Sequence, residues 1–295
     1  MKNHPKFLRF AFVVIVLASM LACNIPFIQV SIGNTPTPAI AVLPSPSAEP
    51  VVTEQPTNSG MAEMPPANVK SYDSGVITFS YDISVFMDID AQTIPAVQPE
   101  GNNAPYFAVA PLHTELTLKG YVIPNNTPAP KMYIYPAAEF GVMLDSVQQE
   151  INTLKLIIAN NSSNVQGDLP LLPPQNAEQV FHSNFKQLQF QNGAGIRFIT
   201  MYAQALNPIN NQNVFYTFQG ITSDGKTYIS IFLPVNNLIL PADGTNPPGG
   251  DWTAFMNNFD TYLAGVVDQL NASPDDSFTP NLQLLDEMVQ SIVLK

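Results

Sequence analysis

The sequence predicts an α+β domain built on an antiparallel sheet flanked by helices, preceded by a signal peptide and a Pro-rich tether. Three observations lead to this prediction. Segments with the two-residue alternation of strands fill much of residues 71–295, two Gly-containing turns join neighbouring strands, and amphipathic helical stripes close the chain. Strands joined by tight turns pair antiparallel, and helices gathered at one end of the chain are typical of α+β folds.

The N-terminus carries the pattern of a secretory signal. Three basic residues, Lys2, Lys6 and Arg9, precede an uncharged run, Phe10–Ala22, which leads directly to the only cysteine, Cys23. A membrane-spanning helix needs roughly 20 apolar residues, so this shorter run favours a signal peptide over residues 1–22. The alternative is an uncleaved membrane anchor that continues beyond Cys23.

The end of this segment, Leu21-Ala22-Cys23, resembles the lipobox of bacterial lipoproteins, with Met20 in place of the commoner Leu. The resemblance implies cleavage before Cys23 and acylation of this cysteine, which becomes the new N-terminus. The mature protein would then be lipid-anchored in the cell membrane and would face the extracytoplasmic side, because two or more acyl chains give stable anchoring. With the thiol acylated, cysteine catalysis and cysteine-based zinc sites are excluded.

The mature sequence is acidic. Loss of residues 1–22 would remove three basic residues and no acidic one, which leaves 8 basic and 23 acidic side chains and a net charge of −15. Nucleic acid is therefore not an expected partner, since it requires a positive surface. Residues 23–70 are rich in Pro, Ser and Thr and are predicted to be a disordered tether. Residues 71–295 are predicted to form a single α+β domain.

The first half of this domain predicts four strands and one helix. Alternating apolar residues predict strands, the second pairing with the first, at 76–81, 85–89, 112–122 and 132–135. After Pro136, apolar residues recur at helical spacing as far as Ile158 and predict one amphipathic helix. Residues 160–174 are predicted to be a long polar and Pro-rich connection.

Two hairpins are predicted in the second half. Asn192-Gly193 and Asp224-Gly225 each lie between two segments with strand alternation. Both dipeptides suit two-residue turns because their residues readily take positive φ. Gly193-Ala194-Gly195 is interpreted as part of the first turn, since a dinucleotide-binding loop would need a third glycine and a following helix.

Two helices are predicted at the C-terminal end. Asp251 is expected to cap the first, whose apolar face continues to Leu270. Thr279-Pro280 is expected to begin the second, because proline is favoured at the first helical position.

Several motifs resemble a family of uncharacterised bacterial lipoproteins. They are Gln191-Asn192-Gly193, Gly195-Ile196-Arg197-Phe198, Phe215-Tyr216-Thr217-Phe218-Gln219-Gly220, Asp224-Gly225-Lys226, Val180-Phe181-His182 and Leu171-Leu172-Pro173-Pro174. This resemblance implies no known activity. A second likeness, through residues 77–81 and 285–292, is to the PsbP/Mog1 type of α+β sandwich, although Asp82 and Ile83 stand where that type commonly has Pro and Trp. It implies a binding or assembly accessory rather than an enzyme.

Catalytic chemistry has few candidates. The mature chain has two histidines, His113 and His182, without the His-Glu-x-x-His spacing. A zinc site would need a third ligand, and the candidates are Glu115, Glu178 and Asp145. Ser183 and Ser230 lack the Gly-x-Ser-x-Gly elbow of a nucleophilic serine. No catalytic residue, metal or cofactor is therefore predicted, and His182 is interpreted as a hydrogen-bonded residue at a helix end.

Arg197, His182 and Trp252 are the candidate ligand-binding residues. Arg197 is the only arginine left after processing, and strand alternation places it on the face of Ile199 and Met201. Its guanidinium could bind an anionic or carbohydrate ligand, or could pair with a structural acid. Trp252 could mark a sugar-stacking or protein-binding surface, but its helical spacing with later aromatic residues favours the core.

A Gly- and Pro-rich loop contains Asp243, Asn246 and Asp251. Their oxygen atoms could hold Ca²⁺, but turn formation and helix capping also account for these residues.

These observations predict a membrane-anchored bacterial surface lipoprotein with a non-enzymatic binding or assembly role. Its expected partners are the membrane, through lipid at Cys23, and an envelope protein or glycan. Two alternatives stay open: an extracellular hydrolase that uses His182 or His113, and a solute-binding lipoprotein with a deep pocket near Arg197.

Overall fold

The computed structural model describes residues 68–99, 104–163 and 165–295. Twelve strands are present in this part: β1 (Val69–Asp73), β2 (Ile77–Asp82), β3 (Asp88–Ile94), β4 (His113–Lys119), β5 (Lys131–Pro136), β6 (Glu178–Phe190), β7 (Gly193–Ala203), β8 (Phe215–Thr222), β9 (Thr227–Pro234), β10 (Asn236–Asn237), β11 (Phe278–Thr279) and β12 (Val293–Leu294). The α-helices of the same part are α1 (Ala137–Met143), α2 (Asp145–Ala159), α3 (Trp252–Asn257), α4 (Phe259–Ala272) and α5 (Leu282–Gln290). The signal peptide, Cys23 and the tether as far as residue 67 lie outside the described residues.

The predicted α+β class with antiparallel sheets is confirmed. The main sheet has seven strands in the order β3-β4-β5-β9-β8-β7-β6, and every neighbouring pair is antiparallel. A three-stranded sheet has the order β1-β2-β12, and β10 pairs with β11. Among the described residues, no helix combines the length and the apolar character that crossing a membrane requires.

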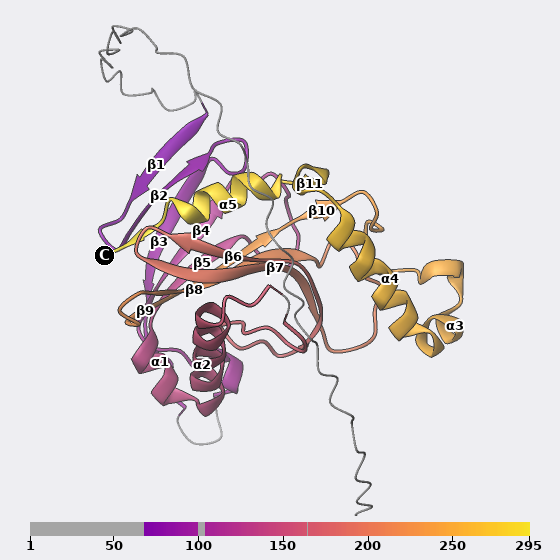
Figure 1. The fold of residues 1–295 in the computed structure, drawn as a ribbon, viewed down its shortest axis with the longest axis horizontal. Coiled ribbons are helices and arrows are strands. Elements are labelled where there is room, and N and C mark those ends of the chain that lie inside the picture. The colour runs from indigo at the N-terminus through magenta and orange to yellow at the C-terminus, as the bar shows by residue number, and fades with distance from the viewer. Residues whose placement is uncertain (1–67, 100–103, 164) are drawn as a thin grey trace, which may run out of the picture. The chain divides into compact units, whose positions relative to one another are not determined.

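Both faces of the seven-stranded sheet are buried at its central strands β8 and β9, whereas the edge strand β3 has no buried residue (Figure 1). The apolar sides of α1 and α2 cover one face, and α5 with the β1-β2-β12 sheet covers the other. Side chains of β9 alternate between the two sides of the sheet. Ile231 and Leu233 belong to the core on the α5 side, and Phe232 belongs to the core on the α2 side. Strands covered on both sides need apolar residues at most positions, which explains the nearly continuous apolar runs in β8 and β9.

The predicted partner of the opening strand is wrong. Residues 85–89 do not pair with β2; strand β3 begins at Asp88 and pairs with β4 instead. The partners of β2 are β1 on one side and the C-terminal β12 on the other. Strand β1 includes Val69 and Lys70, so the folded part begins before the predicted end of the tether at residue 70.

Each long helix expected from periodicity is broken once. Leu144 has extended backbone angles (φ −143°, ψ 126°) and separates α1 from α2. Asn258 separates α3 from α4, and its side-chain amide donates to the Ala254 carbonyl over 2.8 Å at the end of α3. The cap predicted at Asp251 is present, since its carboxylate accepts from the backbone amides of Thr253 and Ala254.

The predicted start of the last helix is wrong. Helix α5 begins after Asn281, whose side chain accepts from the backbone amide of Gln283 over 2.8 Å. Thr279 belongs to strand β11 and Pro280 precedes the cap, so neither residue begins the helix. Asparagine is as good an N-cap as the predicted threonine.

Both hairpins are present, but their turns differ from the prediction. The first turn consists of Gln191 and Asn192, and Gly193 is already paired with Phe190 as the first residue of β7. In the second turn, which spans residues 223–226, Gly225 alone has positive φ (+72°).

Gly195 is required by packing within the sheet and not by a turn. It lies opposite Gly220 on β8. A Cβ atom on Gly195 would lie 2.3 Å from the Gln219 carbonyl oxygen and 2.6 Å from the Phe218 ring. The ring of Phe218 therefore occupies the space that side chains at the two glycines would need.

Candidate ligand-binding groove along β6

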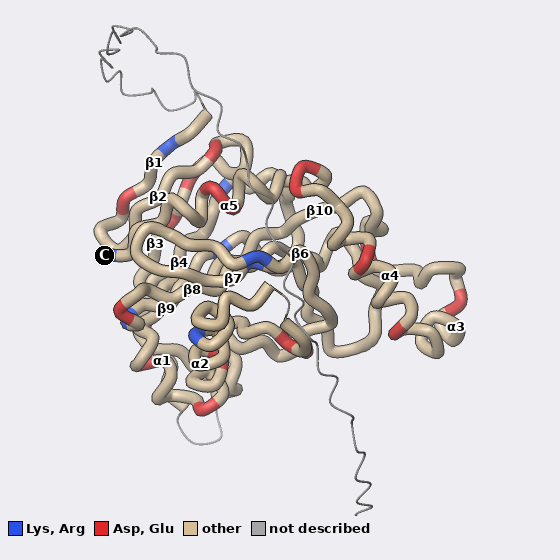
Figure 2. Tube along the Cα trace, in the orientation of Figure 1, with Lys and Arg blue, Asp and Glu red and all other residues tan. Residues whose placement is uncertain are grey.

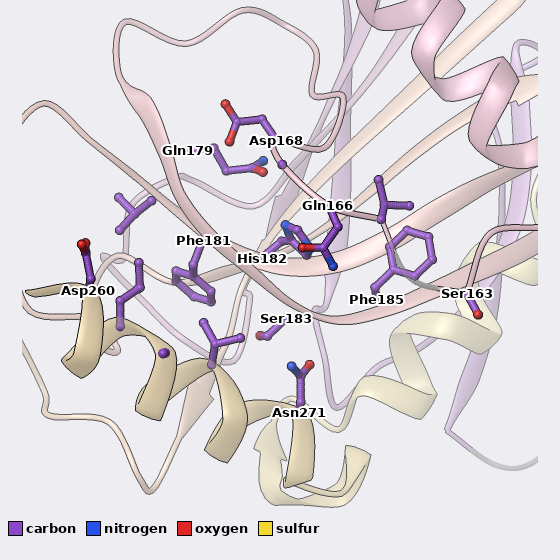
Figure 3. Close-up of a pocket in the computed structure, with 16 residues that line it drawn as sticks. Ser163, Gln166, Asp168, Gln179, Phe181, His182, Ser183, Phe185, Asp260 and Asn271 are labelled. Atoms are coloured by element: carbon purple, nitrogen blue, oxygen red, sulfur yellow. The ribbon is translucent and has the colours of Figure 1, made fainter. Parts of the chain in front are cut away.

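A hollow of about 740 Å³ lies beside β6, the edge strand of the large sheet (Figure 3). Strand β6 forms its floor, α4 forms one wall, and residue 163 with residues 165–168 forms the other wall. Ligand pockets commonly have volumes of about 300–1,000 Å³, so the hollow is large enough for an organic ligand.

Helix α4 is attached to the rest of the domain near both of its ends. The hydroxyl of Tyr262 accepts from the backbone amide of Ile209 over 2.9 Å. At the other end, the side chain of Asn271 accepts from the Asn184 backbone amide over 2.7 Å, and the Asn184 side chain donates to the Leu270 carbonyl over 2.9 Å. Asn184 has positive φ (50°) at an irregularity of β6, which turns its backbone toward α4. The hollow lies between these two attachments.

The opposite wall is held by two glutamine side chains of β6. Gln187 donates to the carbonyl oxygens of Ile157 and Ser162 over 3.0 and 3.2 Å. Gln179 accepts from the backbone amide of Leu169 over 2.9 Å. The strand that forms the floor thus also positions this wall.

Two further hollows, of about 490 and 670 Å³, adjoin the first and share Gln179 with it. We call the three hollows together the β6 groove. Among the side chains that line it are Glu150, Asp168, Glu178, Gln179, Phe181, His182, Ser183, Phe185, Asp260 and Asn271.

The hydroxyl of Ser183 is buried in the groove and makes no hydrogen bond to the described residues. Its residue is only 1% exposed, and its Oγ has no hydrogen-bond partner in the described part of the chain. Figure 3 shows Ser183 between β6 and α4, where it lines the first hollow. Burial of an unpaired hydroxyl destabilises a protein by about 1–3 kcal/mol. A ligand with a polar group at this point would remove that cost.

His182 is a half-buried residue of strand β6, and the predicted place at a helix end is wrong. Burial lowers the pKa of His182, while contacts with the Val165 backbone and the charge of Asp168 partly oppose this effect. The imidazole is therefore neutral near pH 7. Neighbouring residues of a strand point to opposite faces, so His182 cannot activate the Ser183 hydroxyl.

His113 lies far from His182. It belongs to β4, five strand spacings from β6, which is about 24 Å along the sheet. Its Nδ1 lies 2.8 Å from the Pro111 carbonyl oxygen, and its ring packs against Tyr135. The two histidines cannot share a metal ion or a substrate. The described residues contain no group of three or more His, Asp or Glu side chains placed to hold a metal ion.

The groove carries negative charge that no basic side chain of the described residues balances. Glu150, Asp168, Glu178 and Asp260 line it, and none of the ion pairs of the described residues includes these four. Six of the eight described basic residues form ion pairs with other acids. In Figure 2, the segment from Asp251 to the end of α4 shows acidic positions and no basic ones.

The pKa of Glu150 is affected by burial and by this negative charge. Burial, and secondly the charge of Asp168, raises the pKa of Glu150 to about 6, and a contact with the Leu171 backbone amide lowers it slightly. The side chain is still mainly ionised at pH 7, but its charged form is less stable in the folded protein than in the unfolded chain.

Glu150→Gln should raise the free energy of unfolding near pH 7 by about 1 kcal/mol. A shift from the ordinary value of 4.5 to about 6 corresponds to about 2 kcal/mol, and solvent screening of the partly exposed side chain reduces this. Because the folded state binds the proton more tightly, the destabilisation is complete above pH 6 and disappears as the pH falls to 4.5.

Urea unfolding of the full-length protein between about pH 4 and pH 8 measures this effect. Glu139→Gln, on the exposed side of α1, is the matched control and should give no such pH-dependent gain. A gain for Glu150→Gln that is as large at pH 4 as at pH 7 would contradict the electrostatic explanation.

Two of the three predicted ligand-binding residues lie outside the groove linings. Arg197 is buried (3% exposed) and forms ion pairs with Asp286 and Asp275, at 3.2 and 3.0 Å. Its guanidinium thus has the structural role that the sequence left open, and the deep pocket expected near it is replaced by these carboxylates. Trp252 is 39% exposed and packs edge-to-face on Phe255, so the prediction of a core position is wrong.

The remaining candidates have structural roles. Ser230 Oγ donates to the Leu172 carbonyl and accepts from Gln219, which fixes the Pro-rich connection on the sheet. Asp243 accepts from the backbone amide of Thr245 in a turn, and Asp251 caps α3.

Comparison with known proteins adds no family. No protein-family model, curated protein or solved structure matches the chain.

Most groove residues escaped sequence reasoning because they come from distant segments. Residues 150, 168, 178–183 and 260–271 belong to three separate parts of the chain and form no motif. One signal was available: Lys and Arg are absent from residues 156–185 and from residues 227–294. These two stretches supply most of the groove.

Proposed function

We propose that this protein is a lipid-anchored lipoprotein of the bacterial envelope whose α+β domain binds an envelope glycan in the β6 groove. The observation that carries the binding role is the buried hydroxyl of Ser183, which has no hydrogen-bond partner among the described residues and lies in a hollow of ligand size. The groove also presents amide and carboxylate side chains beside the rings of Phe181 and Phe185. Such a mixture suits the hydroxyl groups and apolar faces of sugars.

A glycan fits this edge of the sheet better than a peptide strand does. A peptide that extends a sheet needs a regular row of outward backbone groups. The register of β6 is interrupted between Gln179 and Phe181 and again between Ser183 and Lys186. In addition, the backbone amide of Asn184 is already bonded to Asn271. These irregularities oppose strand addition and leave side chains to bind the ligand.

The anchor is proposed from the sequence around Cys23. Its place after a short apolar run and the lipobox-like Leu21-Ala22-Cys23 support a membrane-bound, extracytoplasmic protein. The hydrolase alternative stays a prediction that no arrangement of His182 or His113 favours, and no catalytic role is proposed.

Cosedimentation with purified bacterial cell-wall sacculi tests the binding role. The detergent-solubilised full-length protein should sediment with the sacculi, and Ala264→Trp should return it to the supernatant by filling the first hollow from α4. Ala264 is exposed, so the substitution should leave the core intact. Thr261→Trp places the same ring on an exposed part of α4 outside the groove lining and should sediment normally. Equal sedimentation of both variants would show that the groove is not the binding site.

A further inference from the structure

We propose that the β6 groove selects a glycan that carries primary ammonium groups, such as an oligosaccharide of de-N-acetylated amino sugars. This inference rests on the proposed glycan-binding role and names the class of ligand. It follows from the negative charge of the groove together with the Ser183 hydroxyl, for which the described residues provide no hydrogen-bond partner.

The four carboxylates of the groove take part in none of the ion pairs of the described residues. Asp90, Glu115 and Asp286 each lie within about 3 Å of a lysine nitrogen. Asp168 and Asp260 line the first hollow, and no lysine or arginine lines it. A cleft lined by one sign of charge attracts ligands of the opposite sign, and here that ligand is a cation.

The cation is organic rather than a metal ion. The described residues offer no group of three or more metal-ligating side chains. The first hollow instead combines carboxylates with the aromatic rings of Phe181 and Phe185. An ammonium group donates hydrogen bonds to carboxylates and hydroxyls, and aromatic faces attract it.

The histidine of the site supports the same ligand. His182 is neutral near pH 7 because burial lowers its pKa, so it adds no positive charge that would repel an ammonium group. Ser183 Oγ, which has no partner in the described part of the chain, provides an acceptor inside the hollow.

The series of hollows matches an oligomer. The hollow of about 490 Å³ adds Glu150 and Glu178 to the acidic lining and shares Asp168 with the first hollow. Acidic side chains therefore continue from one hollow to the next. A chain of amino sugars, with one charge on each unit, would find carboxylates along this path.

Isothermal titration calorimetry of the full-length protein in detergent tests the inference. The probes are the tetramer of glucosamine and the fully N-acetylated tetramer, at low salt and about pH 6.5, where amino groups are largely protonated. The glucosamine tetramer should bind roughly tenfold more tightly, because each exposed ion pair contributes up to about fivefold. Added salt should weaken its binding and leave that of the acetylated tetramer unchanged.

Matched variants locate the preference. Asp168→Asn with Asp260→Asn should reduce the preference for the amino form, because only Glu150 and Glu178 of the acidic lining remain, while Asp268→Asn, exposed on the same helix and outside the groove lining, should retain it in full. Ser183→Ala should weaken binding of the glucosamine tetramer several-fold without loss of the folded state, since it removes a hydroxyl that no other described group uses.

The outcomes separate the preference for ammonium groups from the glycan-binding function on which it rests. Equal binding of both tetramers, or tighter binding of the acetylated one, overturns the ammonium preference and leaves the glycan-binding function standing. Binding of neither tetramer overturns both. Spermidine, which has ammonium groups and no sugar ring, should bind more weakly than the glucosamine tetramer. If it binds as tightly, the ligand is a free polyamine and the glycan assignment is wrong.

Discussion

Asp286→Ala should lower the free energy of unfolding by about 3–5 kcal/mol, because it leaves a buried arginine without its main counter-charge. Asp286 lies on α5 and is 2% exposed. Its carboxylate is 3.2 Å from Arg197 Nε, 2.9 Å from Lys186 Nζ and 3.1 Å from the Tyr216 hydroxyl. This one side chain fixes α5 to strands β6, β7 and β8, so its loss should loosen the whole layer.

The expected loss of stability arises because the Arg197 charge stays buried without its main partner. The attraction within the Arg197–Asp286 ion pair contributes little by itself. Replacing both buried charges, by Arg197→Met with Asp286→Leu, should recover most of the lost stability, since apolar pairs of similar volume often replace buried ion pairs without penalty. Lys186 and Asp275 would then lose a partner, but their side chains are 48% and 37% exposed and can be solvated. The buried Tyr216 hydroxyl would also lose its partner, and this accounts for the stability that is not recovered.

Urea unfolding followed by far-UV circular dichroism measures these differences. Asp90→Ala is the control, because the Asp90–Lys119 pair is exposed (41% and 53%) and should contribute less than about 1 kcal/mol. A loss below about 1 kcal/mol for Asp286→Ala, or a double variant that is weaker than the single one, would contradict this account.

Arg197 illustrates how far the sequence leads. Alternation along β7 correctly placed Arg197 on the face of Ile199 and Met201, and its pairing with an acid was one of two predicted roles. The identity of that acid was out of reach, because Asp286 is 89 positions away on another element. Local periodicity determines which face a residue occupies, whereas the partner depends on how distant elements pack.

The errors in the strands and turns have the same physical origin. Gly195 resembled a turn residue in the sequence, yet the Phe218 ring on the neighbouring strand is what requires glycine there. Residues 85–89 were a reasonable local partner for β2, but strands from both ends of the domain, β1 and β12, occupy its edges. Local sequence patterns were enough to predict the fold class. The pairing of strands depends on contacts between segments that are far apart in the sequence.

The groove was beyond sequence reasoning for a further reason. Its defining feature is the Ser183 hydroxyl, which has no partner in the part of the chain that the structure describes; this is a property of packing and cannot be seen in residue spacing. Nothing separates Ser183 from any other strand serine until α4 covers it. The one sequence feature that indicated an acidic surface was the absence of Lys and Arg from residues 156–185 and 227–294.

Cys23→Ala should abolish incorporation of an alkyne fatty acid when the full-length protein is expressed in a bacterium. Only the thiol of Cys23 can receive the lipid, since the chain has no other cysteine. The unmodified chain should carry the label and partition with membranes, because more than one acyl chain gives stable anchoring and each buried CH₂ contributes about 0.8 kcal/mol. Click detection in membrane and soluble fractions provides the measurement.

The same experiment separates a lipoprotein from an uncleaved membrane anchor. Met20→Leu, which introduces the commoner lipobox residue, is the matched control and should label at least as well as the unmodified chain. In an uncleaved anchor, the apolar run would have to hold the protein in the membrane without lipid. Phe10–Ala22 is shorter than the roughly 20 residues that a membrane span needs, which argues against this. Undiminished label on Cys23→Ala would refute acylation at this cysteine. Absence of label on every chain, with full membrane retention, would favour the uncleaved anchor, and the β6 groove would still face the envelope from that anchor.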